Sequence, residues 1–223
     1  MIHKIKGAIF DMDGTLIDSL MLWDIIWESF GRTYLGREGY RLPEQADKAI
    51  RTMTLRDGME MIHETCGLGE SGTELLEAAN AIIRNFYANE VQLKPGVREF
   101  LNSCRERGIK MCIASATGPK LLKTAIDRCE IGDYFSHILS CAQLGKGKDQ
   151  PDIYLAAMEQ LGTTKEETCV FEDSAVAIAT AHNMGLMTVA IYDQYNYGQD
   201  EMRRTADAYI AEGETLLKLV AIT

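Results

Sequence analysis

Two aspartates separated by one residue stand directly after a short apolar run near the start of the chain. Asp11 and Asp13, in the segment 11–15 (DMDGT), follow the apolar run 5–10. Carboxylates crowded at the end of a buried strand repel each other, and a cation held between them removes that cost. Mg²⁺ prefers carboxylate oxygens and commonly binds together with phosphate. These residues therefore predict chemistry on a phosphate group.

Gly14 and Thr15 complete the segment, and both suit a loop that meets an anion. Glycine allows the backbone to come close to a ligand, and threonine adds a hydroxyl group. We expect backbone amides near these two residues to hydrogen-bond a phosphoryl group.

The composition of the 223-residue chain limits its partners. The formal net charge is −10, which argues against nucleic acid, because binding to a phosphate backbone needs clustered lysine and arginine. A small phosphorylated metabolite is compatible with this charge, since a metal and one lysine can reverse its sign locally.

No apolar stretch is long enough to cross a bilayer, and the first apolar run is too short for a signal peptide. We expect a cytoplasmic monomer or small homo-oligomer without a membrane partner. Its six cysteines should be reduced thiols.

Helical periodicity dominates the first part of the chain. Apolar residues recur at three- and four-residue spacing from about residue 18 to residue 91, which predicts a small helical bundle. Asp18 and Ser19 stand ahead of the first apolar stripe as possible N-caps. Thr54 precedes a second stripe, which ends at Gly67.

The pattern changes after residue 95, where short apolar strands alternate with helices. Such alternation predicts a parallel sheet covered on both faces. The fold class is therefore α/β, a doubly wound parallel sheet, with the helical bundle inserted after the first strand. We expect one domain formed by 1–16 and 92–223, and a helical cap formed by 17–91.

Four apolar strands are each followed by polar residues. Besides the two aspartates, Ser115 follows the strand 110–114, Lys148 lies in a loop, and Glu172 and Asp173 follow the strand 169–171. Ligands of parallel sheets bind beyond the carboxyl ends of the strands. A carboxylate nucleophile, a hydroxyl, a lysine and an acidic pair should thus converge on one rim.

This set, in this order, resembles the haloacid dehalogenase superfamily of phosphohydrolases, in the branch that contains phosphoglycolate phosphatase and β-phosphoglucomutase. The matching segments are 11–19 (DMDGTLIDS), 115–117 (SAT), 147–148 (GK) ahead of 151–154 (PDIY), and 171–174 (FEDS). The resemblance implies a Rossmann-like core with an inserted cap. It also implies a Mg²⁺-dependent phosphatase that hydrolyses a small phosphomonoester through an aspartyl-phosphate.

The resemblance also assigns roles to residues. Asp11 would attack phosphorus, and Asp13 would protonate the leaving oxygen and then take a proton from water. Mg²⁺ would be held by Asp11, Asp173 and the backbone carbonyl of Asp13, with Glu172 as a direct or water-mediated ligand. Lys148 would neutralise the nucleophile and the phosphoryl oxygens. Contacts to the substrate are expected from Ser115, Gly14, Thr15 and Ala116. Arg56 is expected to contact it because of its position in the helical bundle.

Several alternatives stay open at this level. A phosphomutase would use the same phospho-aspartate but return the phosphate to a sugar hydroxyl. A receiver-type signalling module also combines acids, a hydroxyl and a lysine on a parallel sheet, although it lacks an inserted bundle. Lys146 competes with Lys148 for the lysine role, and Asp149 could draw Lys148 away from Asp11. Glu172 and Asp173 could simply cap the following helix.

Overall fold

The computed structural model describes residues 2–51 and 53–220. The chain forms two compact units, one made of Met1–Leu20 with Val91–Thr223 and the other of Met21–Glu90. We call the first the sheet unit and the second the helical unit.

The sheet unit contains a six-stranded parallel sheet in the order β5-β4-β1-β6-β7-β8. Its strands are β1 (Gly7–Phe10), β4 (Lys110–Ser115), β5 (His137–Ser140), β6 (Thr168–Glu172), β7 (Met187–Ile191) and β8 (Ala208–Ile210). All residues of β1 and of β6 are buried, as the continuous apolar runs of central parallel strands require. The rings of Phe10 and Phe171 stack across these two strands at 4.5 Å.

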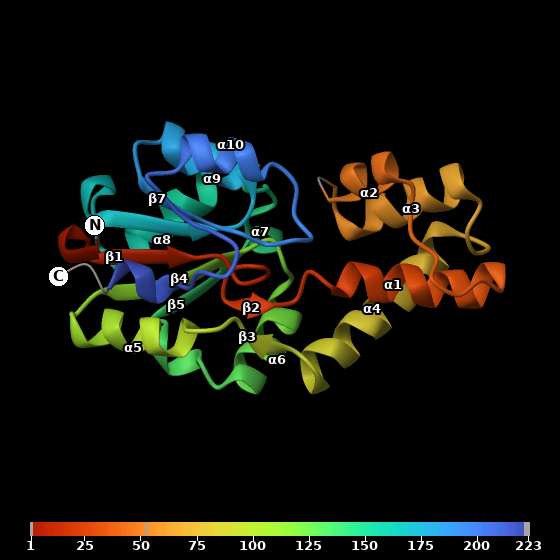
Figure 1. Ribbon diagram of the computed structural model, residues 1–223, viewed down its shortest axis with the longest axis horizontal. Coiled ribbons are helices and arrows are strands. Elements are labelled where there is room, and N and C mark those ends of the chain that lie inside the picture. Colours follow the sequence, from red (N-terminus) through yellow and green to blue (C-terminus); the bar gives the residue numbers. More distant parts are fainter. Residues whose placement is uncertain (1, 52, 221–223) are drawn as a thin grey trace. The chain divides into compact units, whose positions relative to one another are not determined.

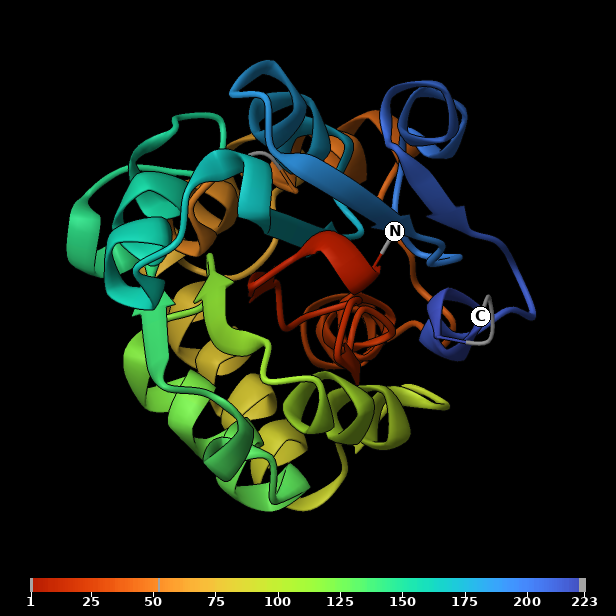
Figure 2. The same cartoon turned by 90° about the vertical axis from the view of Figure 1, so that its left-hand side faces the viewer.

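Helices cover both faces of this sheet (Figures 1 and 2). On one face α8 packs against β4 and α9 against β7, and α5 and α6 lie on the other face. The helices of the sheet unit are α5 (Val97–Glu106), α6 (Pro119–Cys129), α7 (Cys141–Leu144), α8 (Asp152–Leu161), α9 (Ala175–Asn183) and α10 (Gln199–Thr205), with 3-10 turns η1 (Ile2–Lys4), η3 (Gly132–Tyr134), η4 (Lys165–Glu167) and η5 (Leu216–Leu219). The predicted doubly wound α/β fold is confirmed.

The strand order reverses at β1, which pairs with β4 on one side and β6 on the other. Connections that leave to opposite sides at such a point keep the space beyond the strand ends open. The residues that follow β1, β4 and β6 therefore share one edge of the sheet.

The helical unit consists of α1 (Leu22–Phe30), a π-helical segment η2 (Gly31–Leu35), α2 (Glu44–Ile50), α3 (Leu55–Cys66) and α4 (Gly72–Asn89). Thr54 caps α3 as expected, because its side chain accepts a hydrogen bond from the amide of Asp57. The helix ends at Cys66, and its C-cap Gly67 adopts the left-handed conformation that favours glycine. Helices α3 and α4 pack against each other, and Trp27 of α1 is buried.

The expectation of continuous helix from residue 18 to residue 91 is wrong at the start of that range. Strand β2 (Ile17–Asp18) pairs antiparallel with β3 (Gln92–Leu93), so Asp18 lies in a strand. Helix α1 begins only at Leu22, after Met21, and neither Asp18 nor Ser19 caps it. The hydroxyl of Ser19 is engaged elsewhere, by the carboxylate of Asp13.

No helix in the described part of the chain, residues 2–51 and 53–220, is long and apolar enough to span a membrane. All six cysteines are free thiols, as expected, and five of them are buried.

Candidate active site

Lys148 joins two carboxylates at the carboxyl ends of β1 and β6. Its Nζ lies 2.5 Å from Oδ1 of Asp11 and also contacts Oε1 of Glu172. Both carboxylates are buried, and the Lys148 side chain is 11% exposed. Burial alone would lower the pKa of this lysine, but the Asp11 and Glu172 carboxylates raise it well above its ordinary value. Lys148 therefore stays cationic beside Asp11.

Asp11, Glu172 and Asp173 form a buried acidic cluster. One carboxylate oxygen from each lies within 4.8 Å of the others. Burial, followed by the neighbouring carboxylates, raises the pKa of Asp11 against the opposing effect of Lys148. Burial and then Glu172 raise the pKa of Asp173 to about 7. Three carboxylates facing one lysine carry two excess negative charges when all are ionised. The donor set, which consists of hard oxygen atoms, and this charge both fit a divalent cation such as Mg²⁺.

Glu172 divides its carboxylate between two tasks. Its Oε1 faces Lys148, while Oε2 accepts hydrogen bonds from the amides of Asp173 and Ser174, each at 3.2 Å. These two amides precede α9, which begins at Ala175 without a side-chain cap, so the alternative in which Glu172 and Asp173 simply cap the next helix is not supported. Oε1 helps to place the lysine.

Asp13 stands apart from the acidic cluster, and hydroxyl groups hold both of its carboxylate oxygens. Oδ1 accepts from Ser19 Oγ at 2.7 Å, and Oδ2 accepts from Thr117 Oγ1 at 2.8 Å. Its carboxylate is thus oriented by one residue next to β2 and one beyond β4. This leaves the Asp13 side chain outside the set of oxygens that could hold a metal together.

Gly14 is required where it stands, because Asp173 lies against it. Its φ is +77°, and a Cβ there would lie 2.2 Å from Oδ2 of Asp173. Thr15 Oγ1 donates to Oδ1 of the same carboxylate at 2.9 Å. The amides of Gly14 and Thr15 donate to the carbonyls of Ile17 and Met12. The turn itself uses these two amides, and the expectation that backbone amides near Gly14 and Thr15 hydrogen-bond a phosphoryl group stays a prediction.

The remaining expected residues occupy different surroundings. Ser115 is the last residue of β4 and is buried, and its Oγ accepts a hydrogen bond from the amide of Thr117 at 3.1 Å. Ala116 is exposed beside it. Arg56 is exposed in the first turn of α3, in the helical unit. The structure therefore brings Asp11, Lys148, Glu172 and Asp173 together, whereas Ser115 and Ala116 lie at the end of β4 and Arg56 belongs to the helical unit.

Lys146 and Asp149 take no part in the cluster. Lys146 pairs with Asp152 at 2.7 Å, and its side chain is 53% exposed. Asp149 is exposed and accepts a hydrogen bond from Gln150 Nε2. The expected pull of Asp149 on Lys148 is not seen, because Lys148 Nζ contacts Asp11 and Glu172.

Besides Ser19, two further contributors were not identified from the sequence. Thr117 belongs to a matched segment, but its contact with Asp13 depends on the approach of β4 to β1. Asn196, in the loop after β7, donates to Asp173 from 23 residues away. Pairing across the sheet brings these residues to the site, and spacing along the chain carries no sign of it.

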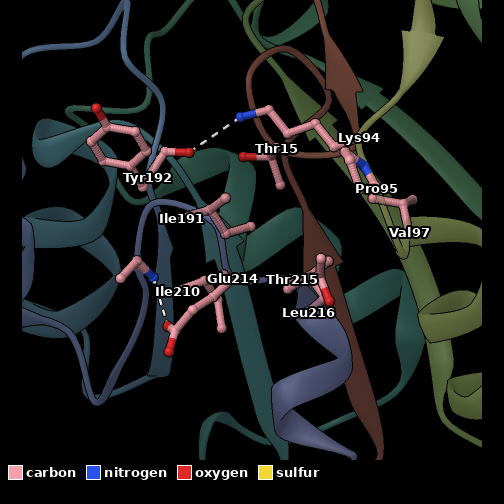
Figure 3. Close-up of a pocket in the computed structure, with 11 residues that line it drawn as sticks. Thr15, Lys94, Pro95, Val97, Ile191, Tyr192, Ile210, Glu214, Thr215 and Leu216 are labelled. Carbon is pink, nitrogen blue, oxygen red and sulfur yellow. Dashed lines mark hydrogen bonds between the residues drawn. The ribbon is translucent and has the colours of Figure 1, made fainter.

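A pocket of the sheet unit lies next to this site (Figure 3). Its lining includes Thr15, Lys94, Tyr192 and Leu216 but none of Asp11, Asp13, Ser115, Lys148, Glu172 or Asp173. Lys94 Nζ donates to the carbonyl of Tyr192 at 3.3 Å and to Oδ2 of Asp193 at 2.7 Å. The pocket thus adjoins the site through Thr15 and does not contain the groups that could do chemistry.

The chain is similar in sequence to known hydrolases. Residues 5–185 match the model of the haloacid dehalogenase-like hydrolases. The chain is 27% identical over 214 residues to a phosphorylated carbohydrates phosphatase of Thermotoga maritima, covering 95% of this chain and 96% of the relative. It is 28% identical over 199 residues to phosphoglycolate phosphatase 1 of Pseudomonas aeruginosa, covering 86% and 71%.

A solved structure from Thermotoga maritima, described provisionally as a β-phosphoglucomutase, has the same fold. The TM-score is 0.79 at 24% sequence identity, and the match covers 98% of this chain and all of the other. The predicted enzyme class, a phosphoric monoester hydrolase, agrees with the names of the curated relatives. The chain belongs to the haloacid dehalogenase-like hydrolase family.

Proposed function

We propose that this protein is a Mg²⁺-dependent phosphatase that hydrolyses a small phosphomonoester through a phosphorylated Asp11. The observation that carries this proposal is the cluster of Lys148, Asp11, Glu172 and Asp173 beyond the central strands of the sheet. Its buried carboxylates and single lysine offer one carboxylate oxygen as nucleophile together with oxygen donors for a divalent ion.

Asp11 would attack the phosphorus atom, so that a bond forms to its carboxylate oxygen while the bond to the leaving oxygen breaks. Asp13 would give a proton to that oxygen and later take one from the water that attacks the aspartyl-phosphate. Both steps need Asp13 in a fixed place, and its two hydroxyl partners, Ser19 and Thr117, provide that restraint.

Mg²⁺ held by Asp11, Asp173 and the carbonyl of Asp13 would supply positive charge next to the phosphoryl oxygens. Lys148 would add charge from the protein side and keep Asp11 oriented. We assign to Glu172 mainly the placement of Lys148, because its second oxygen already serves two amides. Ser115, at the end of β4, would hydrogen-bond the transferring group.

The substrate would be a small phosphorylated metabolite, and the phosphatases named for carbohydrate phosphates and phosphoglycolate support this class. Gly14 and Thr15 would shape the site through Asp173, and Ala116 would border the substrate. A contact from Arg56 remains a prediction, as do the cytoplasmic location and the oligomeric state. If Arg56→Ala leaves kcat and KM unchanged on the best substrate, that contact is wrong.

The test is release of inorganic phosphate from a panel of phosphomonoesters with Mg²⁺. Phosphate release should disappear with EDTA and in Asp11→Asn, while Asp133→Asn, an exposed aspartate in η3, should behave as the wild type. Isomerisation of a sugar phosphate only after priming with a bisphosphate would instead identify the phosphomutase alternative. Absence of both activities would contradict the nucleophilic role of Asp11.

A further inference from the structure

Asn196, in the loop after β7, contacts Asp173 twice through its side-chain amide. Nδ2 lies 2.7 Å from the backbone oxygen of Asp173 and 2.8 Å from its Oδ2. Both hydrogens of the amide are thus used, and Oδ1 accepts from the amide of Tyr197 at 3.0 Å. These partners fix the orientation of the amide group, because exchanging its oxygen and nitrogen would place an acceptor against two acceptors.

The carboxylate of Asp173 is held from its other side as well. Thr15 Oγ1 donates to Oδ1 at 2.9 Å, so each oxygen accepts a hydrogen bond from a different segment of the chain. Gly14 packs directly against Oδ2, which occupies the space that a Cβ at this position would need. Rotation of the Asp173 carboxylate would therefore break at least one of these hydrogen bonds.

The loop that carries Asn196 is itself anchored by a buried aspartate. Asp193 accepts from the amide of Tyr195 at 2.9 Å and from Lys94 Nζ at 2.7 Å. Gln199 Nε2 donates to the carbonyls of Asp193 and Asn196. Because these bonds hold the backbone turn, the two hydrogens of the Asn196 amide are not needed inside the loop and are directed at Asp173.

We propose that Asn196 is a positioning residue for the metal-binding carboxylate of Asp173, orienting it by donating to its Oδ2 while Thr15 holds Oδ1. The inference rests on the proposed function, since it assigns Asp173 to the metal. Partners of this kind, which hydrogen-bond a metal ligand without touching the metal, typically contribute ten- to a hundred-fold to metal affinity.

The test measures Mg²⁺ binding without substrate, by calorimetric titration and by the rise in melting temperature. The variants are Asn196→Ala and Asn196→Leu, of which the second keeps a branched side chain without the donors. The matched control is Asn183→Ala, an exposed asparagine at the last position of α9. We expect both Asn196 variants to bind Mg²⁺ roughly ten- to a hundred-fold more weakly, and the control to bind as the wild type.

Activity supplies a second measurement that separates positioning from catalysis. The Mg²⁺ concentration that gives half-maximal phosphate release should rise with the loss of affinity, while kcat at saturating Mg²⁺ recovers to within a few-fold of the wild type. Unchanged Mg²⁺ affinity in both variants, with wild-type binding intact, would overturn the role of Asn196 and leave the phosphatase proposal standing. If the wild type itself binds no Mg²⁺, the metal-dependent function fails, and this inference fails with it.

Discussion

Ser19 Oγ donates a 2.7 Å hydrogen bond to Oδ1 of Asp13. Ser19 directly follows β2, the strand that pairs with β3, so the proposed proton-transfer residue is tied to the segment that leads out of the sheet unit. Thr117 holds the other oxygen from beyond β4. The orientation of Asp13 thus depends on two hydroxyl groups that are 98 residues apart in the sequence.

Replacing Thr117 by valine removes one of these hydroxyl groups and keeps the shape of the side chain. A hydrogen bond to a charged group is worth about 1.5–3 kcal/mol, so we expect kcat/KM for an alkyl phosphate to fall roughly ten-fold or more. p-Nitrophenyl phosphate should be affected less, because its leaving group departs without a proton. Steady-state kinetics on both substrates measures the difference.

Thr124→Val is the matched control, since Thr124 Oγ1 donates to the carbonyl of Lys120 within α6. Equal losses on the two substrates in Thr117→Val would show that Thr117 acts on something other than proton transfer by Asp13.

Sequence reasoning predicted the parts of the site that depend on strand ends. Asp11, Lys148, Glu172 and Asp173 follow or approach buried strands, and parallel pairing is enough to bring such positions together. The sheet itself could be predicted because each strand is a short apolar run. The pairing of β2 with β3 could not, because two-residue strands carry no periodic pattern.

The hydrogen-bond partners of the acidic residues were also beyond prediction from sequence. Asn196 looks like an ordinary loop residue, and only the bend around Asp193 turns its amide toward Asp173. The turn uses the amides of Gly14 and Thr15 internally, which the residue types did not reveal. Local turn geometry decides such cases, and residue types do not specify it.

Substitution of the two lysines in the loop before α8 should have clearly different effects on activity and stability. Lys148→Met leaves Asp11 and Glu172 facing each other without their shared cation, so activity should fall to background. Breaking a buried pair from one side costs on the order of 3–5 kcal/mol, which denaturant unfolding can measure.

Lys146→Met serves as the control for this prediction. Its pair with Asp152 is largely exposed and should contribute no more than about 1 kcal/mol, with activity retained. Loss of phosphate release in Lys146→Met but not in Lys148→Met would reverse the assignment of the lysine.

The buried cysteines should be inert toward thiol reagents in the native protein. Burial raises the pKa of Cys104 and Cys112 to about 12, and it also raises the pKa of Cys129, Cys141 and Cys169. At about pH 8 these thiols are protonated as well as shielded, so only the half-buried Cys66 should react quickly. Titration with a chromogenic disulfide should give one fast thiol before denaturation and six after it. Cys66→Ser should remove the fast phase, and a second fast thiol would contradict the burial of the other five.

The ionisation of Asp173 should make the metal-free protein less stable as pH rises. Burial, and then the Glu172 carboxylate, raise the pKa of Asp173 from 3.8 to about 7. Between these values the native state binds more protons than the unfolded chain, so the free energy of unfolding decreases as pH increases through this range. Asp173→Asn lacks this ionisation and should lose that slope.

Melting temperatures in EDTA, taken from about pH 5 to about pH 8, measure this effect. The free energy of unfolding of Asp173→Asn, relative to that of the wild type, should rise steadily with pH. At the upper end of the range the difference should have changed by an amount on the order of a few kcal/mol. Any constant offset from the altered contacts with Thr15 and Asn196 does not change with pH and so does not disturb the comparison. Asp133→Asn, on the surface, should follow the wild-type curve.

Adding Mg²⁺ at about pH 8 should restore the stability of the wild type, because the ion favours the ionised carboxylate. It should leave the stability of Asp173→Asn almost unchanged. Parallel curves for the wild type and Asp173→Asn in EDTA would mean that the cluster carries no such excess of negative charge, and the electrostatic argument for a divalent cation would fail.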